Sequence, residues 1–169
     1  MSVSLRPKKI LMIGAPAVGK TSVTRRLKFG TFDVDYKSTI GVQLHEIPVS
    51  TSQGELAMLV WDTDGNFGEQ VFDTVYAKGA TGAIVVGDVS RPDTVEHMVR
   101  LADDFAVHFP ARPSLCLVNK TDLFEPSAQS LDDLRGRVDM LASCSALSGA
   151  GLDAAFTAFA ETVVARSQL

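Results

Sequence analysis

The chain has 169 residues, of which 46% are hydrophobic and 21% are charged, and its 16 basic and 20 acidic residues give a net charge of −4. These values are typical of one globular domain, which we place at residues 1–169. The acidic balance, without a basic run, argues against nucleic-acid binding, and no apolar run reaches the roughly 18 residues of a membrane span. Cys116 and Cys144 lie in or beside apolar stretches and are expected to be buried free thiols, which predicts a cytoplasmic protein.

The first predicted elements enclose a phosphate-binding motif. Residues 8–13 form a short apolar run that predicts a buried strand, and residues 21–29 predict a helix. Between them lies Gly14-Ala15-Pro16-Ala17-Val18-Gly19-Lys20-Thr21, which fits G-x-x-x-x-G-K-[ST]. The backbone N–H groups of such a loop and the start of its helix surround an anion. Lys20 brings positive charge to the β- and γ-phosphates, and the Thr21 hydroxyl can hold Mg²⁺.

The rest of the chain alternates strands with helices. Strands are predicted at 42–49, 56–61, 83–86, 114–118 and 138–142, the first two as an antiparallel hairpin. Helices are predicted after a loop within 66–80, from residue 91, within 126–137 and after residue 151. This order predicts an α/β fold of the P-loop NTPase kind: a mostly parallel six-stranded sheet with one antiparallel edge strand and helices on both faces. Ligands of such sheets bind at the carboxyl ends of the strands.

The motif after the strand at 114–118 indicates which base is bound. Asn119-Lys120-Thr121-Asp122 fits N-K-x-D. The Asp122 carboxylate can accept both neighbouring donors of guanine, N1–H and the exocyclic amine. Adenine has no such pair and would leave a buried carboxylate unpaired, which is costly. Together with the phosphate loop, this motif predicts a guanine-nucleotide site.

On these motifs the chain resembles, over nearly its whole length, the small GTPases of the Ras superfamily and within it the Rab-like branch. Three further segments match: Tyr36-Lys37-Ser38-Thr39-Ile40-Gly41-Val42, Trp61-Asp62-Thr63-x-Gly65 and Ser145-Ala146. The resemblance implies a molecular switch that binds GTP or GDP with Mg²⁺ and hydrolyses GTP. Hydrolysis then relaxes two switch loops. It also implies that effectors, GTPase-activating proteins and exchange factors bind residues about 31–45 and 62–80.

The resemblance also implies the roles of individual residues. It places Mg²⁺ on Thr21, Thr39 and, through water, Asp62. It places the nucleotide on Ala15, Pro16, Ala17, Val18, Gly19, Lys20, Thr21, Ser22, Phe32, Thr39, Gly65, Asn119, Lys120, Asp122, Ser145, Ala146 and Leu147. Within this set, the Ala146 N–H is expected to face the guanine oxygen. The catalytic set is Lys20, Thr39, Gly65 and Asn66.

The chain departs from the family pattern at several of these positions. Asn66 stands where the family has the Gln that orients the attacking water, and it is one methylene shorter, so slow hydrolysis is expected. Asp64 replaces a small Ala, and a carboxylate beside a phosphate is repulsive unless it points away or meets a cation. Pro16 and Ala17 replace glycines, and Pro16 has no N–H to donate. Leu147 replaces the Lys whose stem covers the guanine.

Two alternatives remain open at this point. One is a hydrolysis-deficient, GTP-bound interaction module, which Asn66, Asp64 and Pro16 motivate. The other is a P-loop kinase or ATPase, against which the N-K-x-D motif counts. The chain ends without a terminal Cys, so no intrinsic membrane anchor is expected, and a prokaryotic or divergent eukaryotic member is suggested. Asp88 is interpreted as a strand end and Arg91 as part of a solvated face or a cap.

Overall fold

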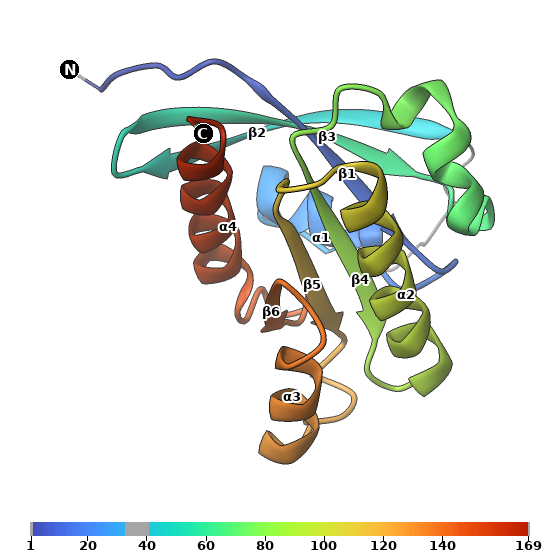
Figure 1. Ribbon diagram of the computed structural model, residues 1–169. Helices are drawn as coiled ribbons and strands as arrows, with labels where there is room; N and C mark the ends of the chain where they lie inside the picture. The colour runs from blue at the N-terminus through green and yellow to red at the C-terminus, as the bar shows by residue number, and fades with distance from the viewer. Residues whose placement is uncertain (1, 33–40, 169) are drawn as a thin grey trace.

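A six-stranded mixed sheet forms the centre of the molecule in the computed structural model, which describes residues 2–32 and 41–168 (Figure 1). Its strands are β1 (Lys8–Gly14), β2 (Val42–Thr51), β3 (Gly54–Thr63), β4 (Gly82–Asp88), β5 (Ser114–Asn119) and β6 (Met140–Ser143). Its helices are α1 (Lys20–Phe29), α2 (Pro92–His108), α3 (Ala128–Arg135) and α4 (Leu152–Arg166), with 3₁₀ segments η1 (Gly65–Asp73) and η2 (Val75–Ala77). The strand order is β2-β3-β1-β4-β5-β6.

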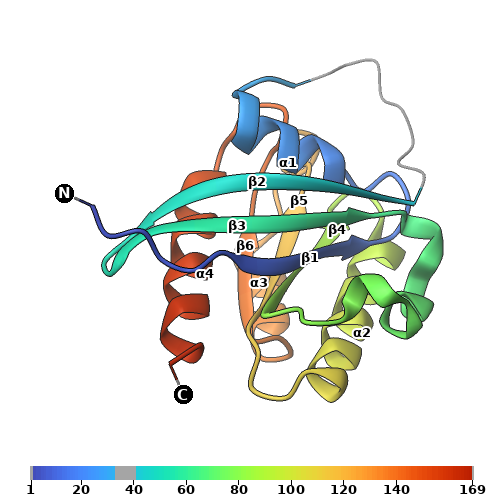
Figure 2. The same ribbon diagram turned by 90° about the horizontal axis from the view of Figure 1, so that it is seen from above.

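The predicted fold class is confirmed, because all neighbouring strands are parallel except the β2–β3 pair at one edge. That hairpin is longer than predicted: its register runs from Val42 opposite Thr63 to Thr51 opposite Gly54. Only two residues therefore form the turn. Figure 2 shows the turn end of this hairpin beside α4, where the Ser52 N–H and hydroxyl donate to Glu161 at 2.6 and 2.8 Å.

Apolar side chains on both faces of the sheet make two cores. In β1, Ile10 and Met12 face the cluster that contains α4, whereas Leu11 and Ile13 face the cluster that contains α2. Successive side chains of a strand point to opposite faces, so a strand covered on both sides is apolar throughout. The uninterrupted apolar run of β1 thus reflects its central place in the sheet, with helices on both sides (Figure 1).

The segment after β3 differs from the prediction. We expected a loop running into a helix within 66–80, but the chain forms η1 and η2, neither of which is an α-helix. Gly68 has φ 53° and ψ −138°, which interrupts any helical run. The segment is instead anchored by the buried side chains of Val71, Phe72 and Ala77. Within the described ranges, no helix has the length and apolar character that crossing a membrane requires.

Asp139 joins the end of α4 to the start of β5. Its carboxylate accepts two hydrogen bonds of 2.8 Å from the Arg166 guanidinium and one of 3.1 Å from the Ser114 N–H. Burial opposes the charge, but these bonds hold the pKa of Asp139 below its ordinary value of 3.8. The pair therefore stabilises the fold above that value, and its contribution is lost as the pH falls through the lowered pKa.

We predict that Asp139→Asn lowers the free energy of unfolding by about 1 kcal/mol at pH 7, since the pair is bidentate but partly exposed. Urea denaturation measures this change, which should shrink toward pH 3. Asp132→Asn is the matched control, because its contact with Arg135 is largely exposed. Equal losses in the two variants would contradict the assignment.

Candidate functional site

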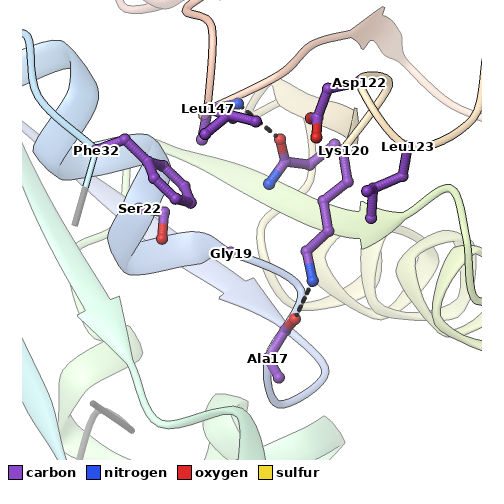
Figure 3. Close-up of a pocket in the computed structure, with 10 residues that line it drawn as sticks. Ala17, Gly19, Ser22, Phe32, Lys120, Asp122, Leu123 and Leu147 are labelled. Carbon is purple, nitrogen blue, oxygen red and sulfur yellow. Dashed lines mark hydrogen bonds between the residues drawn. The ribbon is translucent and has the colours of Figure 1, made fainter. Parts of the chain in front are cut away.

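A cavity of about 340 Å³ lies where β1, β5 and β6 end (Figure 3). It is lined by Ala17, Gly19, Ser22, Phe32, Asn119, Lys120, Asp122, Leu123, Ala146 and Leu147. All of these except Leu123 belong to the predicted nucleotide set. Leu123 is an exposed apolar residue directly after the N-K-x-D motif. That unusual exposure is visible only in the structure, although its place beside the motif is a sequence signal.

The two outer glycines of the phosphate loop have backbone conformations and close neighbours that leave no room for a side chain. Gly14 has φ 152° and Gly19 has φ 102°, values that side chains disfavour. A Cβ atom at Gly14 would lie 2.5 Å from the Val86 carbonyl oxygen, and one at Gly19 would lie 2.4 Å from Nδ2 of Asn119. Ala17 also has a positive φ, 61°. These conformations curl the loop in the way that forms an anion-binding concavity.

Lys20 is buried at the centre of this loop. Its Nζ donates to the carbonyl oxygens of Gly14 and Ala15 at 3.0 and 2.9 Å. Burial lowers the pKa of Lys20 to about 8, while the nearby charges of Asp62 and Asp64 oppose that change. An ammonium group that has lost much of its hydration through burial favours an arriving anion, as a phosphate site requires.

Thr21 and Asp62 form the predicted metal site. The Thr21 hydroxyl donates to Oδ2 of Asp62 at 2.5 Å. The other oxygen, Oδ1, is buried and accepts no hydrogen bond from any residue that the structure describes. Burial raises the pKa of Asp62, although the Thr21 hydroxyl and Lys20 lower it in part. A buried carboxylate oxygen without a donor suits a cation or its water ligand, so these residues fit Mg²⁺.

The described residues by themselves do not complete this metal site. Across residues 2–32 and 41–168, no group of three His, Cys, Asp or Glu side chains is placed to hold a metal. The ion would therefore take its remaining ligands from water and phosphate oxygens, as is common for Mg²⁺. Thr39, the other predicted ligand, lies outside the described residues, so its role stays a prediction.

Asn119 organises the base end of the cavity. Its Nδ2 donates to the Val18 carbonyl at 3.0 Å, and its Oδ1 accepts from the Ala146 N–H at 3.1 Å. The Ala146 N–H, expected to face the guanine oxygen, is therefore engaged by Asn119 here, and a base would have to share it. Asp122 accepts the Ser145 hydroxyl on Oδ1 at 2.7 Å. Its Oδ2 makes no hydrogen bond within the described part of the chain and remains open to a ligand.

Apolar side chains stand on opposite sides of the base end. Phe32 and Leu147 come from segments far apart in the sequence and flank the cavity together with Leu123 (Figure 3). Leu147 is partly exposed, and its carbonyl oxygen accepts a hydrogen bond of 2.8 Å from Arg26. This bond fixes the backbone that carries the predicted base cover.

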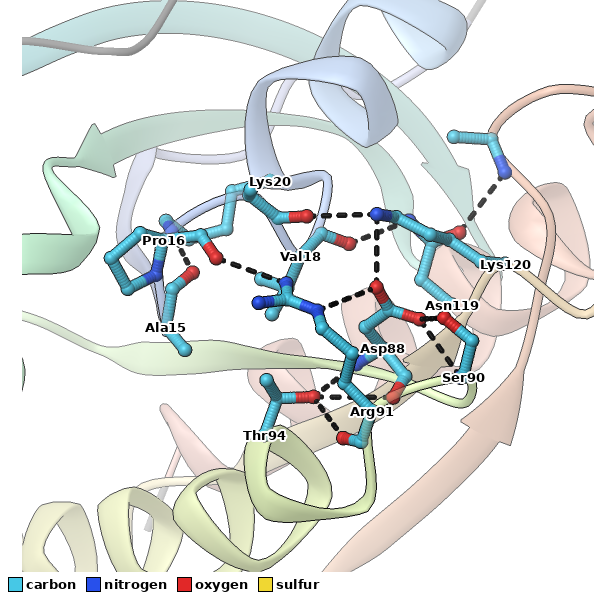
Figure 4. A network of polar contacts seen from close by, with 12 residues as sticks. Ala15, Pro16, Val18, Lys20, Asp88, Ser90, Arg91, Thr94, Asn119 and Lys120 are labelled. Carbon is cyan, nitrogen blue, oxygen red and sulfur yellow. Dashed lines mark hydrogen bonds and ion pairs between the residues drawn. The ribbon is translucent and has the colours of Figure 1, made fainter.

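Sequence reasoning missed a polar network around Asp88, which is shown in Figure 4. The buried Asp88 carboxylate accepts hydrogen bonds from the N–H and hydroxyl of Ser90, and pairs with Arg91 at 3.1 Å and Lys120 at 2.9 Å. Burial alone would raise the pKa of Asp88, but the bonds from Ser90, Lys120 and Arg91 lower it to about 2. Asp88 is thus a charged carboxylate that binds three residues beside the phosphate loop.

Both cations of this network also donate hydrogen bonds to carbonyl oxygens of the phosphate loop. Lys120 donates to the Ala17 carbonyl at 2.8 Å, and Nη2 of Arg91 donates to the Pro16 carbonyl at 3.0 Å. The interpretation of Arg91 as a residue of a solvated face or a cap is incomplete: it is partly exposed and precedes α2 as its N-cap residue, but its side chain also spans from Asp88 to Pro16. The sequence signal was the position of Asp88, the last residue of a buried strand, at the carboxyl end where ligands of such sheets bind.

The predicted catalytic segment lies against the phosphate loop. A Cβ atom at Gly65 would stand 2.5 Å from the Pro16 nitrogen and 2.8 Å from the Ala15 carbonyl carbon, so only glycine allows this approach. Asn66 is exposed, and its N–H donates to the Asp64 carboxylate at 2.9 Å. Gly65 and Asn66 are therefore placed at the phosphate end, and their catalytic roles stay predictions.

Comparison with known proteins identifies related sequences. The sequence model of the Ras family matches residues 9–165 of this chain. The Ras-related protein RABA3 of Arabidopsis thaliana is 32% identical over 165 residues, covering 94% of this chain and 69% of that protein. RABA5b of the same plant is 32% identical over 153 residues, covering 88% and 70%. RABA4b is 31% identical over 128 residues, covering 75% of this chain but only 57% of that protein, so the match spans little more than half of its length.

Removing the charge of Asp88 should loosen the phosphate loop. We predict that Asp88→Asn weakens nucleotide binding about tenfold and lowers the free energy of unfolding by about 2 kcal/mol, because two partly exposed cations lose a buried partner. Calorimetric titration with GDP and urea denaturation measure the two effects. Asp103→Asn, on the exposed side of α2, is the control and should change neither. An unaltered GDP affinity in Asp88→Asn would show that the network does not support the loop.

Proposed function

The chain belongs to the Ras family of small GTPases, and from this membership we propose that it is a Rab-like molecular switch that binds GTP or GDP with Mg²⁺ and hydrolyses GTP slowly. The observation that carries the proposal is the convergence of three separate segments at the carboxyl ends of neighbouring strands. The phosphate loop follows β1, Asp62 lies near the end of β3 in contact with Thr21, and the Asn119–Asp122 motif begins at the end of β5. Each motif matches one part of a guanine nucleotide and its metal.

The phosphate end supports binding of a charged tail. Lys20 would contact the β- and γ-phosphates, while Thr21 and Asp62 would hold the metal ion. When bound, Mg²⁺ would neutralise phosphate charge. Gly65 is close enough to the phosphate loop for its segment to sense a terminal phosphate, as the switch mechanism needs. Thr39 would be the corresponding sensor in the first switch.

Slow hydrolysis follows from the residues that replace the family pattern. Asn66 keeps an amide but is one methylene shorter than Gln, so it reaches less far toward an attacking water. Pro16 donates no N–H, and its carbonyl is held by Arg91. We infer that a partner protein accelerates the reaction. If it does not, the hydrolysis-deficient interaction module is the better description of the same site.

Residues about 31–45 and 62–80 are the proposed surface for effectors, activating proteins and exchange factors. Leu44 and Val75 are exposed apolar residues within these ranges. The centroid of the Tyr76 ring lies 6.3 Å from that of Trp61 and 6.1 Å from that of Phe67, so the three rings form an aromatic cluster. Aromatic residues are enriched in protein interfaces. We also propose a cytoplasmic location and no nucleic-acid partner.

Asp122 should determine the choice of base. We predict that Asp122→Asn weakens GDP binding about 100-fold or more, because the amide replaces an acceptor of two guanine donors with one acceptor and one misplaced donor. Competition of GDP and ADP against a fluorescent guanine nucleotide measures this. Asp133→Asn, exposed on α3, is the control. Equal competition by ADP and GDP in the wild type would instead favour a kinase or ATPase.

Asn66 should act as a brake on hydrolysis. In single-turnover assays with Mg²⁺, we expect wild-type hydrolysis to be slower than the intrinsic rate of Ras itself, about 10⁻⁴ s⁻¹, and Asn66→Gln to be about tenfold faster. Gln70→Asn, an exposed amide of the same segment, is the control and should stay within about twofold of wild type. A wild-type rate at the Ras level would show that another group orients the water. Inert wild type and inert Asn66→Gln, both with GTP bound, would favour the interaction module.

A further inference from the structure

Asp64 is fixed in place at the entrance to the second switch segment. Its N–H donates to the Gly41 carbonyl at 2.8 Å, at the end of the segment that precedes β2. Its carboxylate oxygen Oδ1 accepts the Asn66 N–H at 2.9 Å and so caps η1. The side chain is half-buried. A residue held at both its backbone and its side chain has little freedom to reorient its carboxylate.

The same segment is pressed against the phosphate loop. Gly65, the next residue, approaches the backbone of Ala15 and Pro16 so closely that it has no room for a side chain. The charge of Asp64 therefore acts within the phosphate end, and it opposes the lowering of the Lys20 pKa by burial. Lys20 is the residue whose ammonium would contact the terminal phosphates.

Within residues 2–32 and 41–168, no basic side chain is bound directly to the Asp64 carboxylate, although the Lys20 charge acts on it from nearby. Among the described residues, Asp64 takes part in no ion pair. The guanidinium of Arg91 also lies near Lys20, but it is held by Asp88 and the Pro16 carbonyl. Asp62, the other nearby carboxylate, is the proposed metal residue. In the described part of the chain, Asp64 is thus an additional negative charge without an ion-pair partner.

We propose that Asp64 is a specificity-determining residue that favours the diphosphate over the triphosphate in this site, an inference that rests on the proposed function. A γ-phosphate would bring further negative charge next to a carboxylate that is held in place by its hydrogen bonds, whereas GDP ends before it. Like charges forced together disfavour one ligand relative to another without any lost contact. The GDP-bound state of the switch is therefore the more stable one, and GTP loading must overcome this charge.

The test compares affinities for GDP and for a non-hydrolysable GTP analogue, each measured by calorimetric titration with Mg²⁺. We expect the wild type to bind GDP at least about tenfold more tightly than the analogue. Asp64→Asn keeps an oxygen that can cap η1 but removes the charge. It should tighten binding of the analogue about tenfold and change GDP affinity less than about twofold. Asp64→Ala, which also removes the cap, should change the ratio in the same direction.

Asp73→Asn is the matched control, because it removes one negative charge from an exposed position of the same segment. It should leave the ratio of the two affinities unchanged. If GDP binds but Asp64→Asn leaves the ratio unchanged, or weakens both ligands equally, the inference is wrong and Asp64 is only a cap. If neither the wild type nor Asp73→Asn binds GDP, the proposed function fails, and this inference fails with it.

Discussion

A loop that directs its N–H groups toward an anion cannot use them to bond its own carbonyl groups, and those carbonyls need other donors. In this protein every carbonyl from residue 14 to residue 18 accepts a hydrogen bond from a side chain. The donors are Lys20, Arg91, Lys120 and Asn119, which come from α1, the start of α2 and the end of β5. The shape of the phosphate loop therefore depends on three parts of the fold at once.

This dependence connects phosphate binding to base recognition. Asn119 and Lys120 belong to the motif that indicates guanine, yet in the structure they hold the phosphate loop, and Asp122 alone of that motif has an oxygen open to a ligand. The negative charge of Asp88 pairs with Lys120 and Arg91 and keeps both side chains in position. The two ends of the site are thus one polar network, and a buried network of this kind is rigid only when all its members are satisfied.

Most of the residues that depart from the family pattern lie at the phosphate end, and Leu147 is a departure at the base end. The base end keeps its acceptor and apolar cover, while Pro16, Asp64 and Asn66 alter the region where a terminal phosphate would lie. Binding and hydrolysis make different demands, since binding needs only a complementary site but hydrolysis needs a water held in line. A chain can keep the first while changing the second. The proposed switch is consistent with this division, in which nucleotide choice is retained and the timing is modified.

The sequence by itself determined the order of strands and helices, the parallel sheet with its antiparallel edge, and the ligand-binding edge where the motifs meet. Those features follow from local periodicity and from short motifs whose residues are neighbours in the chain. It did not determine the 3₁₀ segments after β3, because packing of Val71 and Phe72 and the conformation of Gly68 outweighed the apolar spacing that suggested a helix. Nor did it identify the roles of Asp88, Arg91 and Leu123. These depend on contacts across the sheet, such as the 75 positions that separate Arg91 from Pro16, and only the tertiary structure could bring those residues together.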